Sequence, residues 1–177
     1  MTCRFALLRH EVPAGYFRGA GPGQVQDHLD WLFEVNGALR TWATDIPEAT
    51  EIADPFASPF RCAATELPPH RLAYLEREGD IGGGRGRVRR LVSGDYRLRL
   101  ATRDRWSGSL HWIGDAGRPC GADFELQRRT ERVTVQAQAA GEGQVSGEGQ
   151  FSQRNTRESP DADPALAVWR LRFSPWR

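Results

Sequence analysis

An Asn-Gly dipeptide at positions 36–37 is the feature that most constrains the fold of this chain. It separates two runs rich in aromatic, aliphatic and β-branched residues, at 28–35 and 38–44. Asn and Gly both tolerate the positive φ angles of a two-residue type I′ turn, and that turn matches the twist of paired antiparallel strands. The sequence therefore predicts a β-hairpin over residues 28–44.

Short runs of the same kind recur along the chain, whereas helical periodicity is hard to find. We expect further strands at residues 4–9, 86–92, 95–101, 106–113, 122–128, 132–138 and 166–173. Ser93-Gly94 is predicted to be a tight turn between two of them. In 95–101 the alternation predicts one face with Tyr96, Leu98 and Leu100, and the other with Arg97 and Arg99. Strands at hairpin spacing indicate a mainly β fold, a compact antiparallel β-barrel with little helix.

The length of 177 residues suits a single domain over residues 1–177. Two segments, 11–27 and 141–163, are rich in Gly and polar residues and are predicted to be long flexible loops. No apolar run reaches the ~20 residues of a membrane span. The charged N-terminus does not resemble a secretory signal. We therefore expect a soluble cytoplasmic protein that does not associate with a membrane.

The basic residues are all Arg, since the chain contains no Lys. This absence excludes lysyl adenylation, a Schiff base with pyridoxal phosphate and a P-loop lysine. Basic and acidic residues number 24 and 23, so the chain is no bulk polycation, although a local basic site remains compatible with this balance. The three cysteines, at 3, 62 and 120, show no zinc-ligand spacing and favour a reducing compartment.

His28-Leu29-Asp30 falls in the first strand of the predicted hairpin. Alternate side chains of a strand share one face, so His28 and Asp30 are expected to point the same way. His10 ends the preceding strand and becomes a third ligand if the two strands pair. Two imidazoles and a carboxylate suit a divalent transition ion such as Mn²⁺ or Zn²⁺. Taken alone, an H-x-D pattern is also typical of a polar surface.

A second cluster contains His70 and Tyr74, followed by the segment GGGRGRVRR at 82–90. His and Tyr side chains bind phosphate oxygens or transfer protons to them. Glycines let a backbone approach an anion, and guanidinium groups bind phosphate through two hydrogen bonds. The other interpretation is a glycine loop that enters a strand with a solvated arginine face.

These segments, in this order, resemble the 3′-phosphoesterase domain family of bacterial DNA ligase D and its free-standing relatives. The family pattern has a strand ending in His, then H-x-D-x-R-x-E-x-x-G-x-L-x-x-W, then H-x-L-x-Y and a Gly-rich turn into a strand. The similarity covers about residues 4–100. The matching positions are His10, His28, Asp30, Glu34, Gly37, Leu39, Trp42, His70, Leu72, Tyr74, Gly79 and the glycines at 82–84.

The resemblance implies a compact β-barrel that removes a 3′-phosphate, and in some members a 3′-terminal ribonucleotide, from a DNA primer end. It implies that His10, His28 and Asp30 hold a catalytic Mn²⁺. It also implies that His70 contacts the scissile phosphate and that Tyr74 supports it. The expected partners are DNA 3′ ends and separate ligase or polymerase proteins of DNA repair by non-homologous end joining.

Two features of the sequence depart from the family pattern, one residue and the length of one segment. Leu32 stands where the family has a phosphate-binding Arg, and the separation of His10 and His28 is longer than in the family. Arg61, Arg85 and Arg87 are the candidates for replacing the missing guanidinium. The leading hypothesis is therefore a metal-dependent phosphoesterase. The alternatives are a catalytically weak metal-binding module for nucleic-acid ends or repair proteins, and a hydrolase of small phosphoesters.

Overall fold

The structure is a computed structural model that describes residues 3–15, 26–46, 56, 58–114, 117–129 and 168–176. These residues form nine strands, and a short 3₁₀ helix, η2 (Leu72–Leu75), lies between β4 and β5. The strands are β1 (Cys3–Glu11), β2 (His28–Val35), β3 (Ala38–Asp45), β4 (Phe60–His70), β5 (Gly79–Asp80), β6 (Arg87–Ala101), β7 (Arg105–Ile113), β8 (Pro119–Arg129) and β9 (Val168–Pro175).

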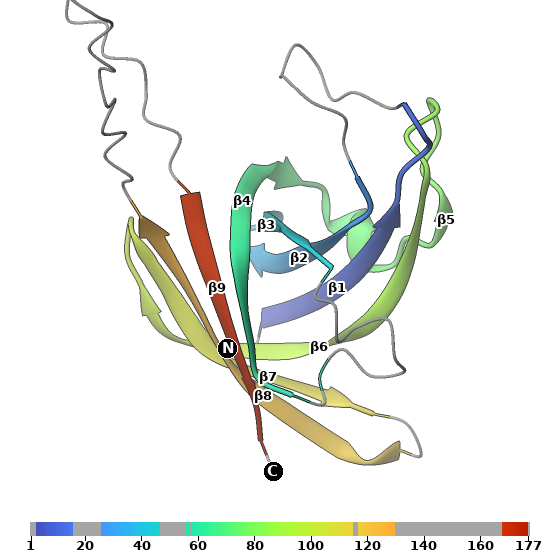
Figure 1. Ribbon diagram of the computed structural model, residues 1–177. Helices are drawn as coiled ribbons and strands as arrows, with labels where there is room; N and C mark the ends of the chain where they lie inside the picture. Colours follow the sequence, from blue (N-terminus) through green and yellow to red (C-terminus); the bar gives the residue numbers. More distant parts are fainter. Residues whose placement is uncertain are drawn as a thin grey trace, which may run out of the picture. The chain divides into compact units, whose positions relative to one another are not determined.

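The strands form one antiparallel sheet that closes into a barrel (Figure 1). Their order is β1-β2-β3-β4-β9-β8-β7-β6-β5, and β1 also pairs with β6, which joins the two sides of the sheet. Eight strands make the closed wall, and the short β5 pairs only with β6. The prediction of a compact antiparallel β-barrel is confirmed.

The predicted Asn-Gly hairpin connects β2 and β3. Asn36 and Gly37 have φ angles of 50° and 84°, as a type I′ turn requires. The register places His28 opposite Asp45 and Val35 opposite Ala38. This turn therefore fixes which residues of β2 and β3 share a face.

The barrel interior is filled by aromatic and aliphatic side chains from all eight wall strands. Rings of Phe33, Trp42, Tyr96 and Phe124 contact one another there at centroid distances of 4.9–6.4 Å. Trp31 is fully buried and belongs to this interior. Alternation along the strand predicts this, because Trp31 points to the other face of the strand from His28 and Asp30. Such packing fixes the curvature of β1 and β2, the strands that carry the candidate ligands.

A second apolar cluster lies on the outer face of the same wall. It consists of Ala6, Leu8, Leu32, Leu39, Leu75, Ile81 and Val88, with Leu72 and Tyr74 packed against it. The segment with η2 and the β5–β6 connection supplies Leu75 and Ile81, and so covers this part of the wall. The adjoining parts of β1 and β2 are thus buried on both faces, which explains their nearly continuous apolar sequence.

Two sequence expectations for β6 are wrong. Ser93-Gly94 is not a turn, because β6 runs without interruption from Arg87 to Ala101. A Cβ atom on Gly94 would lie 2.1 Å from the carbonyl oxygen of His111, so this glycine allows β6 and β7 to approach closely. Leu98 and Leu100 are both exposed, although Leu98 keeps the register of Tyr96. The register shifts after Leu98, so Leu100 lies opposite Ser107 and leaves the face of Tyr96.

The sequence analysis missed β4 and η2. β4 contains Pro68 and Pro69 near its end and has no regular alternation of apolar residues, so it lacks an ordinary strand signal. The expected strand at 132–138, the loop at 141–163 and most of the loop at 11–27 fall outside the described residues.

The chain divides into two units, residues 1–129 with 168–177, and residues 130–167. The barrel belongs to the first unit, and the second lies outside the part of the chain that the structure describes. Within the described part, no helix has the length and apolar character needed to cross a membrane.

Candidate metal centre

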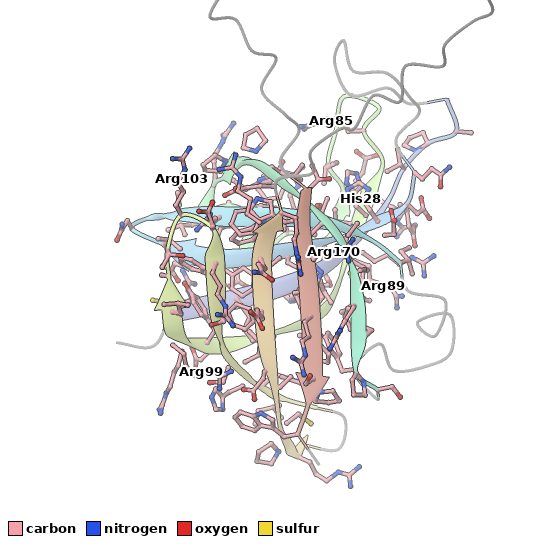
Figure 2. The ribbon with its side chains drawn as sticks, turned by 60° about the vertical axis from the view of Figure 1, so that its left-hand side comes forward. His28, Arg85, Arg89, Arg99, Arg103 and Arg170 are labelled. Atoms are coloured by element: carbon pink, nitrogen blue, oxygen red, sulfur yellow. The ribbon has the colours of Figure 1, made fainter. Side chains whose placement is uncertain are left out.

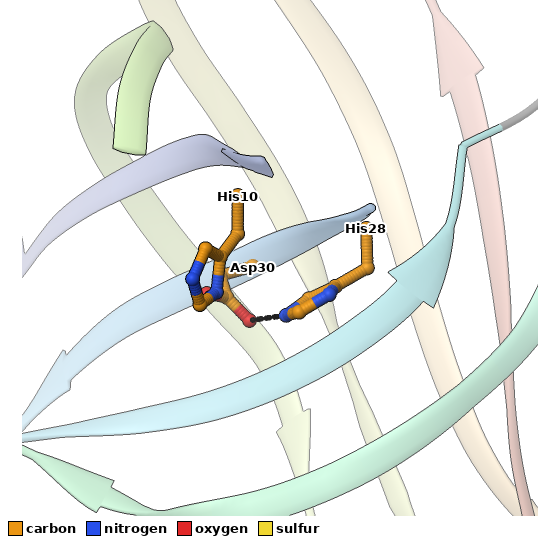
Figure 3. A group of neighbouring side chains, drawn as sticks. All are labelled: His10, His28 and Asp30. Carbon is orange, nitrogen blue, oxygen red and sulfur yellow. Dashed lines mark ion pairs between the residues drawn. The ribbon is translucent and has the colours of Figure 1, made fainter. Parts of the chain in front are cut away.

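His10, His28 and Asp30 come together on the outer face of β1 and β2 (Figure 3). His10 lies directly opposite His28 in the pairing of these strands, and Leu8 lies opposite Asp30. Residues directly opposite in an antiparallel pair share a face, as do alternate residues along a strand. The predicted juxtaposition of these three side chains is therefore confirmed.

The three side chains are buried and close enough to hold one ion. One ligand atom from each lies within 4.8 Å of the others. His28 Nε2 is 3.5 Å from Asp30 Oδ1, and His10 Nδ1 is 3.7 Å from Asp30 Oδ2. Two ligand atoms bound to one transition ion at about 2.1 Å lie about 3–3.5 Å apart, so the separations here are close to those that a shared ion requires.

Backbone carbonyl groups fix the orientation of both imidazole rings. His28 Nδ1 lies 2.7 Å from the carbonyl oxygen of Gln26, and His10 Nε2 lies 2.8 Å from that of Arg85. A carbonyl oxygen only accepts hydrogen bonds, so each of these nitrogens carries the proton. In a neutral ring the other nitrogen, His10 Nδ1 or His28 Nε2, is unprotonated. Metal-binding histidines commonly have this arrangement, in which the second nitrogen donates to a carbonyl.

When both rings are neutral, they bring no positive charge to the centre. Lone pairs of His10 Nδ1 and His28 Nε2 then face the Asp30 carboxylate, which is also an acceptor. His28 Nε2 and Asp30 Oδ1 are buried and have no hydrogen-bond partner among the described residues. Leaving such a group unsatisfied costs about 1–3 kcal/mol. A divalent cation would satisfy both atoms, so this donor set fits a metal ion.

The position two residues after Asp30 is apolar. Leu32 is only 1% exposed and packs in the outer-face cluster with Leu8 and Val88. A guanidinium group at this position would have to enter that cluster, with Asp30 and Glu34 two residues away on the same face of β2. Leu32 therefore lies in a mainly apolar environment, with Thr41 opposite it on β3.

The connection between β5 and β6 lies directly beside the centre. Arg85 supplies the carbonyl that fixes His10, while its guanidinium donates to the carbonyl oxygens of Gly82 and Ile81 at 3.0 and 2.7 Å. Gly86 has φ +94°, and a Cβ atom there would lie 2.0 Å from the carbonyl oxygen of Glu11. Only glycine therefore lets this connection approach β1 at the residue after His10.

His70 and Tyr74 lie on the outer face of the wall, but in a different row. Asp30 of β2 pairs with Ala43 of β3 in one row of the sheet. His70 of β4 belongs to another row, in which it pairs with Leu39 of β3, and Leu39 pairs with Glu34 of β2. Asp30 and Glu34 are four residues apart, or about 13 Å along β2. The rings of His70 and Tyr74 contact each other edge to face at 5.0 Å. Their roles at a phosphate stay predictions.

The three candidate arginines occupy different places. Arg85 is adjacent to the centre, although its guanidinium binds loop carbonyls. Arg87 is exposed, lies opposite Glu11 and forms an ion pair with it at 3.7 Å. Arg61 is near the start of β4 and opposite Arg172 of β9. Their predicted role in phosphate binding is not tested by these positions.

Comparison with known proteins does not identify a family. A scan against protein-family models found no match, and a search of curated proteins found none either.

An ion pair on the same outer face changes two pKa values near Leu39. Arg4 Nε donates to Glu34 Oε2 at 2.7 Å. This hydrogen bond lowers the pKa of Glu34 and raises the pKa of Arg4. The Glu34 carbonyl oxygen also accepts a hydrogen bond from the buried Tyr96 hydroxyl at 2.8 Å. Burial raises the pKa of Tyr96.

The sequence analysis missed the two backbone carbonyls that orient the ligands. Gln26 lies two residues before His28, and Arg85 is 75 residues after His10. Any residue type has a carbonyl, so neither position carries a specific side-chain signal. Only Gly86 offers a clue, because its lack of a side chain permits the close approach.

Proposed function

We propose that this protein is a divalent-metal-dependent phosphoesterase that removes phosphate from the 3′ ends of DNA or of DNA–RNA primers. The observation that carries the proposal is the buried group of His10, His28 and Asp30, with both rings oriented by carbonyls and two acceptor atoms unsatisfied. The order of the sequence segments, which resembles the 3′-phosphoesterase family, supports this choice of substrate.

The three ligands would hold Mn²⁺ in our proposal, and Zn²⁺ suits the same donors. A bound divalent ion would supply Lewis-acid stabilisation to a phosphoryl oxygen and a nucleophile at neutral pH. The task of His10 and His28 is to present unprotonated nitrogens, which the carbonyls of Arg85 and Gln26 secure. Asp30 supplies the negative charge that makes the centre selective for a cation.

His70 lies in a row about 13 Å along the wall from that of Asp30, so we assign it a contact with the bound strand near its 3′ end rather than proton transfer at the ion-bound phosphate. Its Nδ1 lies 2.9 Å from the carbonyl oxygen of Pro68, so that nitrogen carries a proton, and a contact of Nε2 with a phosphate oxygen requires the cationic ring. Tyr74 packs its ring against His70 and would hold the imidazole in place. Arg85 lies on the connection beside His10, and Arg87 begins β6 opposite Glu11; these two are the proposed phosphate-binding guanidiniums of the centre.

The test uses a primer–template with a 3′-phosphate and measures phosphate release with Mn²⁺. We expect the wild-type protein to release phosphate, and His28→Ala or Asp30→Ala to abolish release. His111→Ala is the matched control, because His111 lies on β7 and its Nε2 is 3.2 Å from Ser109 Oγ. Release by the Asp30→Ala variant at the wild-type rate would exclude the proposal.

A second candidate function is a non-catalytic module that binds nucleic-acid ends or separate ligase and polymerase proteins of end joining. Leu32 favours it, because an apolar cluster takes the place of the family guanidinium. Binding of the same primer–template with Mn²⁺ but without phosphate release would support this module. Hydrolysis of a generic aryl phosphate with indifference to DNA would instead indicate a small-molecule phosphoesterase.

A further inference from the structure

The outer face of β4 and β9 carries three exposed arginines, Arg61, Arg170 and Arg172. On β9, Trp169, Leu171 and Phe173 point into the barrel, so Arg170 and Arg172 point outward. On β4, Cys62 and Ala64 face the interior, so Arg61 points outward as well. These guanidiniums therefore share the outer surface of the barrel with the candidate metal centre.

The arrangement of these arginines is unfavourable without an anion. Arg61 lies directly opposite Arg172 in the β4–β9 pairing, and like charges at opposite positions destabilise a sheet. None of the three arginines forms an ion pair with any residue that the structure describes. The acid beside Arg172 on β8, Glu125, is already bound by Arg105 at 2.6 Å.

A continuous row of residues connects the arginines to the metal centre. Leu29, Thr44, Ala64 and Trp169 are aligned across β2, β3, β4 and β9. The adjacent outward row contains His28 opposite Asp45, and Ala63 opposite Arg170. His28 and Arg170 are therefore three strands apart, about 14 Å at ordinary strand spacing. Figure 2 labels both residues.

The row contains one acid. Asp45 is exposed, and it forms no ion pair within the described ranges. Arg61, Arg170 and Arg172 lie beyond it and form a group of positive charges, since the neighbouring Glu125 is bound by Arg105. A row of guanidiniums that begins about 14 Å from a phosphate-cleaving centre suits an extended polyanion better than a single small ester.

We propose that Arg61, Arg170 and Arg172 bind the phosphodiester backbone of the nucleic-acid strand whose 3′ end enters the metal centre. This inference rests on the proposed function and adds the direction of the bound strand, from the centre across β3 and β4 to β9. Contacts of this kind position a substrate without reading its sequence. The surface therefore contributes to substrate affinity and leaves the chemical step unchanged.

The test compares two triple variants that lose the same charge. R61Q/R170Q/R172Q removes the proposed surface. R97Q/R99Q/R103Q is the matched control, because these exposed arginines belong to β6 and the turn after it, three strands from β9. Figure 2 shows Arg99 and Arg103 at the left of the view and Arg170 near its centre. Circular dichroism checks that both variants keep the barrel.

Fluorescence anisotropy measures binding of a labelled single-stranded oligonucleotide with a 3′-phosphate at several salt concentrations. We expect the β4–β9 variant to bind about tenfold more weakly or worse. The slope of log K against log salt concentration should become less steep by about 2, because each of the three lost phosphate contacts contributes about 0.7 to its magnitude. Equal slopes for both variants, or no binding by the wild-type protein, would overturn the inference.

Turnover separates this inference from the proposed function. We expect R170Q/R172Q, which keeps the candidate phosphate-binding Arg61, to raise KM for a long primer and to keep kcat, because His10, His28 and Asp30 are intact. His28→Ala should lose turnover and keep the salt slope. If the wild-type protein hydrolyses no substrate but the β4–β9 variant has the smaller salt slope, the binding surface is supported and the phosphoesterase function is rejected. If the wild-type protein hydrolyses the primer but both triple variants have equal salt slopes, the phosphoesterase function is supported and the binding surface is rejected.

Discussion

Arg40 and Asp30 lie on neighbouring strands of one barrel wall, Arg40 on the inner face of β3 and Asp30 on the outer face of β2. The Arg40 guanidinium is 2.8 Å from Glu66, and its carbon lies 4.6 and 4.8 Å from the ring centres of Trp42 and Trp106. These neighbours all favour a cation. Arg40 thus has the partners that its charge needs.

The neighbours of Asp30 do the opposite. Both rings beside it are oriented by backbone carbonyls so that, when neutral, they present lone pairs to a carboxylate. A half-buried charge with matched partners, as at Arg40, stabilises the wall, whereas buried acceptors that converge on one point suit a ligand. The difference between Arg40 and Asp30 therefore separates a structural charge from a candidate site.

The largest effect is expected for Leu32→Arg, which places a charge in the apolar cluster beside Asp30. Leu32 is 1% exposed among aliphatic side chains, so the guanidinium would bury a charge among them, with Asp30 and Glu34 two residues away on the same face of β2. We expect a loss of about 3–5 kcal/mol in the free energy of unfolding. Urea denaturation measures it. Leu98→Arg is the control, because Leu98 is 41% exposed on β6 and should tolerate the change. Equal losses would show that the outer cluster is not packed as described.

The next effect concerns stabilisation by metal. Mn²⁺ or Zn²⁺ at 100 times its dissociation constant should stabilise the wild-type protein by about 2.7 kcal/mol. Asp30→Asn should remove this gain and leave the metal-free protein at least as stable, because the amide NH₂ group can donate to an unprotonated imidazole nitrogen. Thermal denaturation with and without metal measures both quantities. Asp45→Asn, opposite His28 on β3, is the control and should keep the gain. A strong loss of metal-free stability in Asp30→Asn would make Asp30 a structural charge like Arg40.

Arg40→Met should lower stability with or without metal. The variant keeps the apolar side-chain volume but loses the contacts with Glu66, Trp42 and Trp106. We expect a loss of about 1–2 kcal/mol in the free energy of unfolding. Urea denaturation measures it, and Arg97→Met, at an exposed position on β6, is the control. A variant as stable as the wild type would remove the contrast between the two sites.

The smallest effect is a decline of stability in alkaline solution. Burial raises the pKa of the Cys62 thiol to about 11 from 9.0, and burial also raises the pKa of Tyr96. The unfolded chain releases these protons at lower pH than the folded protein. The stabilising contribution of Cys62 is therefore complete below about pH 9 and is lost as the pH rises towards 11.

Denaturation curves between pH 8 and pH 11 test this decline. Cys62→Ala and Tyr96→Phe should each flatten the pH dependence, because each variant removes one of the two titrating groups. Profiles parallel to that of the wild-type protein would contradict the assignment to these side chains. The experiment also checks the interior of the barrel independently of the metal centre.

Much of the fold could be predicted because local signals agree with it. Asn36-Gly37 determines the β2–β3 hairpin. The alternation of side chains along β2 places His28 and Asp30 on the outer face and Trp31 on the inner face. The pairing of His10 with His28 followed once β1 was assumed to lie beside β2. β4 could not be predicted in this way, because its strand geometry depends on pairing with β3 and β9 rather than on its own sequence.

The surroundings of the site were less predictable. The carbonyls of Gln26 and Arg85 have no sequence signature, and the approach of Arg85 depends on a loop held by Gly86. The position of His70 depends on a register shift between β3 and β4, which no local pattern specifies. The ligand residues could be predicted from strand periodicity, whereas the groups that orient them required the folded chain.

Equilibrium dialysis of the purified protein against Mn²⁺ or Zn²⁺, followed by elemental analysis, is the most direct measurement of the central claim. We expect one ion per chain for the wild-type protein and for Asp45→Asn. We expect none above background for His28→Ala or Asp30→Asn. Metal content that is the same in all four proteins, or absent from the wild-type protein, would contradict the assignment of His10, His28 and Asp30 as a metal centre.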